Sequence, residues 1–490
     1  MFLFGFLTLW SVVHTEVTQI RLADSGEEWN LNVLPNPNST GHLVFDTISS
    51  LLQHWPNTRY HSGHNIVPGI IPTGTLFYHG RGDPHTPTTS EWVATDPEFA
   101  RLFCDSTDVP CFMHTLVATR PLRVLYFDGS SATKQPDGPI DTQDILTWGA
   151  VLPERQTVEW DYKRMHRLCD FGHMLGIDAY VRMQLNFEIM ICNFTDGVEI
   201  TTLSRLQDEP RFPDYAYSFA HSSEWHDAYP GETRIQLDLT HLISLYDVAL
   251  APSLISHRVG RDRRAHRVFG IDKRDTEAVI ARVRAMSWSP SQSGIDWRTL
   301  FQAIRDRYAT RLEVLQSTLN ATDEDDAARR AFGSLLTTLM PYRLHSAVPP
   351  PVGSGNAWAA PVFRLCAETH TSFIGSREST LTASEKLLLN AARETSREIC
   401  RTLVGMWAAG ALELRSSAKI PGSLVAKWKS EVGRLMDWLG WSVWVKCRPA
   451  CASEESCHLP GAPFSMEKWN VTEPLCVRLF LPYSGWPDIP

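Results

Sequence analysis

The residues best placed to do chemistry include a histidine near the end of an apolar run. Tyr78-His79-Gly80 closes the run Gly74-Thr75-Leu76-Phe77 and precedes the glycine-containing loop Arg81-Gly82-Asp83. A strand that delivers a histidine and then a glycine into a polar loop can hold a ribose hydroxyl and a planar amide together. Because the same tripeptide also suits an ordinary strand end, its meaning depends on partners elsewhere in the chain.

Glu188 is the candidate partner, because it is a lone carboxylate between Phe187 and the apolar run Ile189-Met190-Ile191. On a dry side of a strand such a carboxylate would cost several kcal/mol without a partner. Either Glu188 points to solvent from an alternating strand, or it faces a cleft. In a cleft, one fixed carboxylate can stabilise the positive charge that develops as a glycosidic bond breaks.

Short strands and two helices must position these residues. The apolar and β-branched runs predict strands over 75–78, 111–117, 123–127, 179–181 and 187–191, with helices near 97–103 and 153–175. Thr95 or Asp96 would cap the first helix, whose first turn begins with Pro97. This mixture predicts one compact α+β domain over residues 19–210.

In the remainder of the 490-residue chain the pattern of apolar residues changes from short strands to helical spacing. Helical periodicity predicts a helical domain over 235–348, and an acidic patch at 323–326 should cap one of its helices. Its apolar positions are Leu242, Leu245 and Val248, then Val279, Val283 and Met286, then Leu312, Leu315 and Leu319. A Pro/Gly linker over 349–356 and a helical region with a Cys-rich end over 357–490 follow. The predicted fold class is therefore α+β, with a mixed N-terminal domain, a mainly α-helical region and a small disulfide-rich C-terminal module.

Composition limits the classes of function. The hydrophobic and charged fractions, 43% and 21%, are those of a globular protein. A net charge of −9 argues against nucleic acid as the partner, because phosphate binding needs a concentrated basic surface. One segment is basic: arginines and histidines alternate over residues 257–267. It is interpreted as a solvated face, an anion site or a dibasic processing site at Arg263-Arg264.

The amino terminus predicts a secreted, extracellular glycoprotein. Residues 1–18 hold an apolar run that is shorter than the roughly 20 residues of a membrane span and typical of a signal peptide. No second apolar stretch has membrane length, so no span is expected after processing. Four triplets fit the N-glycan acceptor rule, at Asn38, Asn193, Asn320 and Asn470.

The cysteines point to the same compartment. There are ten, and four of them, Cys447, Cys451, Cys457 and Cys476, gather near the carboxyl end. A zinc site that uses three of these thiolates and His458 is the competing interpretation. Because the spacing lacks the Cys-x2-Cys knuckle and a secretory route oxidises thiols, we expect disulfides and no metal.

The order of the motifs resembles ADP-ribosyltransferases of the diphtheria-toxin and poly-ADP-ribose-polymerase type, the His-Tyr-Glu class, over roughly residues 70–205. That family uses a histidine in a Tyr-His-Gly strand, aromatic residues around a strand-helix step, and a glutamate that opens a late strand. The matching pieces are Tyr78-His79-Gly80, then Ala94-Thr95-Asp96 followed by Ala100-Arg101-Leu102-Phe103, then Gly176-Ile177-Asp178-Ala179 before Phe187-Glu188.

The resemblance implies NAD as substrate and assigns roles residue by residue. His79 would hydrogen-bond a ribose hydroxyl, Gly80 would hold the nicotinamide amide by its backbone, and Glu188 would stabilise the oxocarbenium-like centre. Thr95 belongs to the same implied binding set. The two nicotinamide-stacking tyrosines of the family fall near Val93 and Phe103, so Phe103, helped by Trp92, would have to stack. Asn186 replaces the second glutamate of the arginine-modifying branch, which disfavours transfer to arginine.

Two functions of different class follow from the resemblance. The first is a secreted NAD-consuming enzyme that transfers ADP-ribose to an unknown acceptor or hydrolyses NAD. The second is a catalytically inactive secreted binding or structural protein on the same fold, in which the helical, disulfide-rich remainder carries the function. A glycoside hydrolase that pairs Glu188 with Asp178 is a third option, without a motif of its own.

Overall fold

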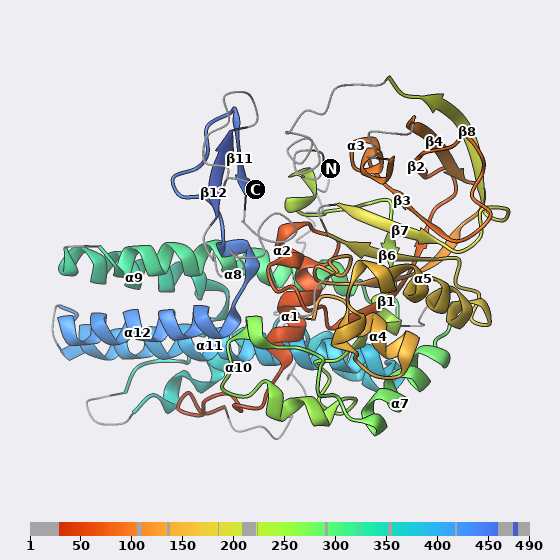
Figure 1. The fold of residues 1–490 in the computed structure, drawn as a ribbon. Coiled ribbons are helices and arrows are strands. Elements are labelled where there is room, and N and C mark those ends of the chain that lie inside the picture. Colours follow the sequence, from red (N-terminus) through yellow and green to blue (C-terminus); the bar gives the residue numbers. More distant parts are fainter. Residues whose placement is uncertain are drawn as a thin grey trace, which may run out of the picture.

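A computed structural model describes most of the chain, and Figure 1 shows its arrangement. The described residues are 29–104, 110–134, 138–184, 186–207, 222, 224–289, 293–321, 323–350, 355–416, 419–458 and 474–478. The predicted signal peptide at 1–18, the sequon at Asn470 and residues 351–354 of the predicted linker at 349–356 lie outside them. The sheet occupies one side of the molecule, and long helices extend from it on the other.

The main sheet has ten strands in the order β10-β1-β5-β6-β7-β3-β2-β4-β8, with β9 also paired to β1. The strands are β1 Asn65–Ile71, β2 Leu76–Arg81, β3 Glu91–Ala94, β4 Phe112–Ala118, β5 Leu122–Phe127, β6 Ala179–Met183, β7 Phe187–Ile191, β8 Val198–Arg205, β9 Gln236–Leu237 and β10 Ile243–Ser244. β5 and β6 run parallel, and the other pairs are antiparallel. The five predicted strands are confirmed.

Helices cover both faces of the sheet. The helices up to residue 284 are α1 Gly41–Ser50, α2 Trp55–Thr58, α3 Pro97–Ala100, α4 Asp141–Trp148, α5 Val158–His173 and α7 Lys273–Arg284. The later helices are α8 Trp297–Leu319, α9 Glu324–Thr338, α10 Ala360–Glu368, α11 Ala383–Ser416 and α12 Gly422–Leu439. Short 3-10 helices used below are η1 Arg101–Cys104, η3 Glu224–Asp227, η5 Pro252–His257, η6 Arg263–Ala265 and η10 Ser442–Trp444.

The central strands are apolar at consecutive positions because both of their faces are buried. On β7, Ile189 packs into the cluster that contains α1, α8 and α11, while Met190 packs into the cluster of α4, α5 and α7. Val181 and Tyr180 on β6 divide between the two clusters in the same way. The sheet is thus the middle layer of three.

Capping residues explain several helix starts. Asp323 precedes α9 and its side chain accepts a hydrogen bond from the backbone N–H of Asp326, as the acidic patch predicted. Asp296 caps α8 in the same way through Thr299. The helical region predicted over 357–490 contains the long helices α11 and α12, and α12 ends at Gly440 in the left-handed conformation.

Two sequence predictions need correction. The periodicity of Leu242, Leu245 and Val248 does not form a helix, because β9 and β10 here add to the sheet edge beside β1. The predicted helix at 97–103 is only a four-residue α-helix that continues as η1. The main apolar cluster contains side chains of the strands as well as of α11 and α12.

Five disulfides pair all ten cysteines: Cys104–Cys111, Cys169–Cys192, Cys366–Cys400, Cys447–Cys457 and Cys451–Cys476. The last two hold a small hairpin, β11 Glu455–His458 with β12 Leu475–Arg478, which projects from the body (Figure 1). The sulfurs of Cys447, Cys451 and Cys457 lie within 4.8 Å of one another, a spacing that could also hold a metal ion. In their disulfide form, however, these sulfurs are not thiolate ligands.

None of the helices in the described ranges is long and apolar enough to cross a membrane.

Candidate functional site

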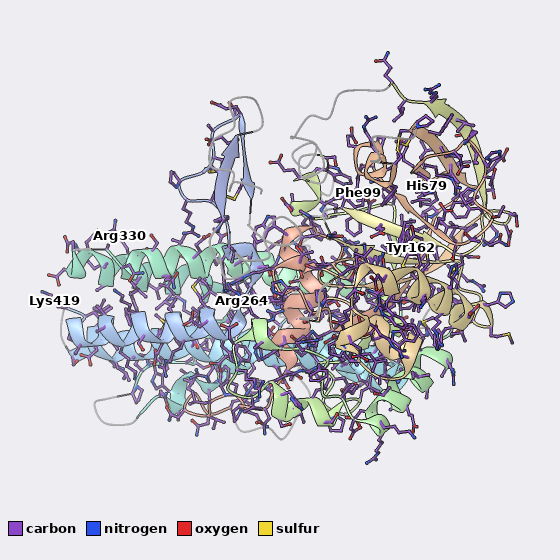
Figure 2. All side chains as sticks on the ribbon, in the orientation of Figure 1. His79, Phe99, Tyr162, Arg264, Arg330 and Lys419 are labelled. Carbon is purple, nitrogen blue, oxygen red and sulfur yellow. A yellow bond between two sulfur atoms is a disulfide. The ribbon has the colours of Figure 1, made fainter. Side chains whose placement is uncertain are left out.

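A cavity of about 410 Å³ lies where β2 and β3 separate. These strands are joined by a single residue pair, Tyr78 opposite Ala94, whereas β3 pairs with β7 along its whole length. Beyond that pair the two strands diverge, and residues of both line the cavity, together with residues of α5 and β7. Figure 2 shows His79 of β2 and Tyr162 of α5 on this side of the molecule, far from Arg330 and Lys419 on the helical arm.

The cavity brings together residues that are far apart in the sequence. Five of the six predicted site residues line it: His79, Gly80, Trp92, Phe103 and Glu188. The lining residues that the sequence analysis did not single out include Glu91, Lys134, Asp161, Tyr162 and His166. Thr95, Asn186 and Asp178 are not among the described residues that line it.

His79 is buried and held from one side only. Its Nε2 lies 2.7 Å from Oε2 of Glu91, whose other oxygen accepts a hydrogen bond of 2.6 Å from Arg81. Because a carboxylate only accepts, Nε2 carries the proton of this contact. Nδ1 of His79 is buried and has no hydrogen-bond partner, and the same is true of Nε1 of Trp92. Two ring nitrogens of residues that line the cavity are thus without a hydrogen-bond partner in the structure.

Glu188 belongs to a buried charge network. It is 3% exposed, so the solvent-facing interpretation of this residue is excluded. Arg182, opposite Glu188 on β6, donates to both of its oxygens at 3.2 and 3.0 Å. The same guanidinium donates to both oxygens of Asp161 on α5, at 2.9 and 2.8 Å. Lys134 Nζ lies 3.5 Å from Asp161 and 4.0 Å from Glu188.

Asp161 and Arg182 keep their charges although both are buried, because the oppositely charged groups of the network lie next to them. Burial by itself would raise the pKa of Asp161, but Arg182, Lys134 and Arg164 hold that pKa well below its ordinary value. Burial would lower the pKa of Arg182, and its two carboxylates raise it instead. Half-buried Glu91 also has a lowered pKa, because the contacts from His79 and Arg81 outweigh the opposing effect of burial.

Aromatic side chains form part of the cavity wall. Val93, one of the two positions aligned with stacking tyrosines, is buried in the main core and faces away. Phe103 lines the cavity 6.1 Å from the ring of His79, measured between centroids. Tyr162 on α5 supplies a further ring, edge-on to Trp92 at 4.7 Å. A tyrosine is therefore present at the cavity, although it comes from α5, which lies outside the matched motifs.

Gly80 is constrained by the strand-helix step that follows β3. A Cβ at this position would lie 2.4 Å from the carbonyl oxygen of Ala100 and 2.9 Å from Sγ of Cys104. Only glycine lets β2 pass this close to α3 and η1. The Cys104–Cys111 disulfide closes the chain immediately after Phe103, which ties this aromatic residue to β4.

Thr95 has a structural position beside the cavity rather than in it. Its carbonyl accepts a hydrogen bond of 2.8 Å from Arg234. Arg234 is in turn paired with Glu232 at 2.6 Å, and fully buried His226 donates to Glu232 at 2.9 Å. Burial opposes ionisation of Glu232, yet the hydrogen bonds from His226 and Arg234 lower its pKa to about 2. This chain of contacts holds the end of β3.

The arrangement suits a reaction in which positive charge develops on a ligand. Glu188 and Asp161 supply negative charge at one side of the cavity, while Glu91 and His79 supply polar groups at the other. The rings of Phe103, Trp92 and Tyr162 can pack against a planar group. No residue in this set forms a recognisable metal centre among the described residues, where metal-type clusters occur only at the C-terminal cysteines.

Comparison with known proteins gives relatives for part of the chain. A family described as the YPL277C N-terminal domain matches residues 31–110 and 105–214. The Saccharomyces cerevisiae protein YOR389W is 30% identical over 213 residues, which are 34% of this chain and 33% of that protein. YPL277C of the same yeast is 29% identical over 214 residues, 34% of this chain and 43% of that protein.

Both yeast proteins carry only the description "uncharacterized protein". The chain thus spans less than half the length of these curated relatives, and no solved structure matches it. The matched family region, residues 31–214, nevertheless contains every residue of the cavity.

Replacing Gly80 by alanine should displace the strand-helix step, because the new Cβ meets the backbone of Ala100. We expect Gly80→Ala to lower the free energy of unfolding by about 1–3 kcal/mol. The matched control is Gly433→Ala, since nothing lies within 4 Å of a Cβ at that position of α12. The control should gain up to about 1 kcal/mol from helix propensity. Equal urea midpoints for the two variants would contradict the close approach at Gly80.

The Glu232 contacts predict a dependence of stability on pH. The folded pKa of Glu232, about 2, lies below the ordinary value of 4.5, so its stabilising contribution is full above pH 4.5 and lost as the pH falls through 2. The melting temperature of wild type should therefore exceed that of Glu232→Gln near neutral pH, and the gap should close on acidification. The measurement is circular dichroism melting of both proteins across this range. A gap that is independent of pH would contradict the assignment.

Proposed function

We propose that the protein is an NAD-consuming enzyme of ADP-ribosyltransferase type, which transfers ADP-ribose or hydrolyses NAD. One observation supports this most: the Tyr-His-Gly strand, the strand-helix step and the glutamate strand lie together around a single cavity. The sequence order alone did not require His79, Phe103 and Glu188 to meet. The single pair between β2 and β3 leaves an opening at the centre of this set.

The proposed roles follow from the contacts. The unpartnered Nδ1 of His79 is available to a ribose hydroxyl, and the backbone of Gly80 to the nicotinamide amide. Phe103, with Trp92 and Tyr162, packs on the nicotinamide ring. Glu188 stabilises the oxocarbenium-like centre as the bond between nicotinamide and ribose breaks, because its carboxylate is fixed in advance by Arg182. Nicotinamide leaves, and water or an acceptor group attacks the ribose carbon.

The second candidate is a catalytically inactive binding protein, and one contact favours it. Arg182 engages both oxygens of Glu188, and Lys134 lies 4.0 Å away, so much of the negative charge of Glu188 is already compensated. A compensated carboxylate offers less stabilisation to a developing cation. Asp161 reduces this compensation of Glu188, because it binds the same Arg182 guanidinium and takes up part of its positive charge.

Release of nicotinamide from NAD distinguishes the two candidates. Glu188→Gln keeps the shape of the side chain and removes its charge, so we expect kcat to fall by about 10²–10³. The matched control is Glu199→Gln on β8, an exposed glutamate outside the cavity, which should keep wild-type turnover. The assay is chromatographic detection of nicotinamide with purified protein, and labelled NAD separates transfer to protein from hydrolysis.

Two outcomes would redirect the assignment. If NAD raises the melting temperature of wild type and no nicotinamide forms, the protein binds NAD without catalysis. If NAD neither shifts the melting temperature nor reacts, the NAD hypothesis is wrong. Equal rates in wild type and Glu188→Gln would remove Glu188 from the mechanism.

We also propose that the protein is secreted and N-glycosylated. The five disulfides are compatible with an oxidising compartment. Among the described sequons, Asn38, Asn193 and Asn320 are exposed, as a glycan acceptor must be.

Glycan attachment is tested with the protein expressed in a eukaryotic secretory host. Treatment with peptide N-glycosidase should increase its mobility on a denaturing gel, because exposed sequons in a secreted chain are modified. The triple variant Asn38→Gln, Asn193→Gln and Asn320→Gln should lose most of this shift. Protein that is retained in the cell and unaffected by the glycosidase would contradict the proposal.

A further inference from the structure

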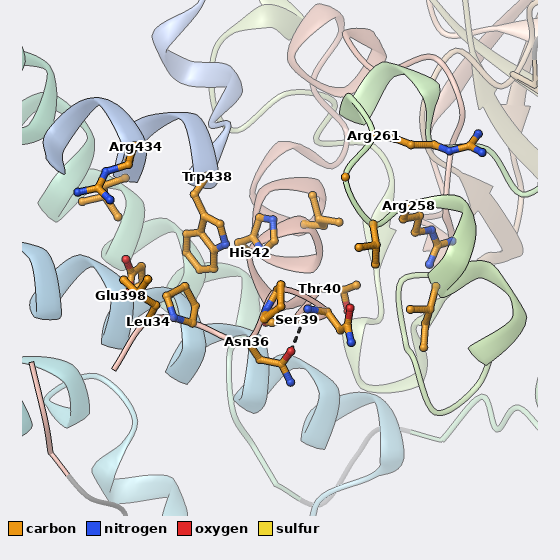
Figure 3. A pocket seen from close by; sticks show the side chains of 18 of the residues that line it. Leu34, Asn36, Ser39, Thr40, His42, Arg258, Arg261, Glu398, Arg434 and Trp438 are labelled. Atoms are coloured by element: carbon orange, nitrogen blue, oxygen red, sulfur yellow. Dashed lines mark hydrogen bonds between the residues drawn. The ribbon is translucent and has the colours of Figure 1, made fainter. Parts of the chain in front are cut away.

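A second cavity, of about 400 Å³, lies on the opposite part of the fold. Its walls come from the segment before α1, from η5 and the turn after it, and from α11 and α12. It shares no lining residue with the cavity at β2 and β3. Figure 3 shows His42 and Trp438 side by side in its middle, Arg434 and Glu398 at one end, and Arg258 at the other.

Arg258 is the unusual residue of this cavity. It is 4% exposed, and only Nη1 has a hydrogen bond, of 2.7 Å, to the carbonyl of Leu245. Nε and Nη2 are buried without a partner. Among the described residues no carboxylate forms an ion pair with Arg258. Its guanidinium carbon lies over the ring of Tyr246, 4.6 Å from the ring centroid, in a cation-π contact. An isolated buried cation is costly, which indicates that an anion completes the site.

The two free nitrogens define the shape of the missing partner. Nε and Nη2 of an arginine form a fork whose two N–H groups match two oxygens of one anionic group. Phosphate, sulfate and carboxylate groups all present such a pair of oxygens. The unsatisfied face of Arg258 therefore fits a single small anion better than it fits a neutral amide.

The surroundings of Arg258 already carry positive potential. Burial, with Arg263 and His266 nearby, lowers the pKa of His42 to about 3. Burial, with Arg258 and Arg263 nearby, lowers the pKa of His266 to about 4. Arg263 is itself compensated by Asp46 at 2.7 Å, and this leaves the charge of Arg258 unbalanced. Both histidines line the cavity and stay neutral because the local field opposes another positive charge.

The rest of the cavity suits the body of such a ligand. Trp438 stacks on His42 with 4.2 Å between ring centroids, and Leu43 and Leu435 add apolar surface. Glu398, which lies at the same end of the cavity as Arg434 in Figure 3, is neutralised by Arg401, which donates to both of its oxygens at 2.7 and 2.6 Å. An anion is therefore not repelled from the cavity by an uncompensated Glu398.

We propose that this cavity is a binding site for a small anionic ligand, whose phosphate, sulfate or carboxylate group pairs with Nε and Nη2 of Arg258 and whose body packs along Trp438. The site does not depend on the proposed NAD reaction. It assigns a ligand to the basic segment at 257–267, where the sequence left an anion site, a solvated face and a dibasic processing site as alternatives.

The test is isothermal titration calorimetry of the full chain with inorganic phosphate, sulfate and acetate, each at constant ionic strength set with potassium chloride. We expect one site for at least one of the three anions, and the preferred anion distinguishes a phosphate or sulfate ligand from a carboxylate ligand. Arg258→Gln should weaken that binding by roughly 10- to 100-fold, since a charge-assisted pair of hydrogen bonds is lost. Arg274→Gln, an exposed arginine on α7, is the matched control and should bind as wild type does.

Arg258→Lys keeps the charge and removes the fork, so it should fold and still bind more weakly than wild type. This variant keeps the test decisive if Arg258→Gln does not fold. The proposal is overturned if none of the three anions binds more tightly than chloride, or if either Arg258 variant binds as tightly as wild type.

Discussion

Arg182 is fully buried, and the arrangement of the strands around the cavity depends on how its charge is compensated. Two carboxylates share it: Glu188 from the adjacent strand and Asp161 from α5. Loss of one partner from a buried ion pair typically costs about 3–5 kcal/mol, so this contact fixes α5 against β6 and β7. The guanidinium of Arg182 therefore both fixes the position of Glu188 and compensates much of its negative charge.

Much of the sheet could be predicted from the sequence because its central strands are apolar at consecutive positions. Among the strands that were not predicted, β9 and β10 are two residues long and take their order from pairing with β1 rather than from their own pattern. Leu242 and Leu245 have helical spacing, yet tertiary pairing determines their structure.

Site residues that belong to a sequence motif could be predicted, whereas residues that reach the cavity only through the packing of the fold could not. His79, Gly80, Phe103 and Glu188 stand in recognisable motifs, and the structure brings them to one cavity. Arg182 carries the same signal as Glu188, because it is also a charged residue in an apolar strand. If the two strands are taken as a hairpin, Arg182 and Glu188 lie opposite each other. Tyr162 and Glu91 carry no such signal, because their positions depend on how α5 and β3 pack.

The position of α1 has a consequence for biogenesis. Asp46, near the start of the chain, accepts a hydrogen bond from the backbone of Ser442 in η10, and Gly41 donates to Glu394 in α11. One face of the sheet is thus completed by helices that come much later in the sequence than the strands. Such long-range contacts delay folding until those helices have been synthesised. The nascent protein must keep the cavity strands soluble until then, so its yield in a cell should depend on chaperones that shield them.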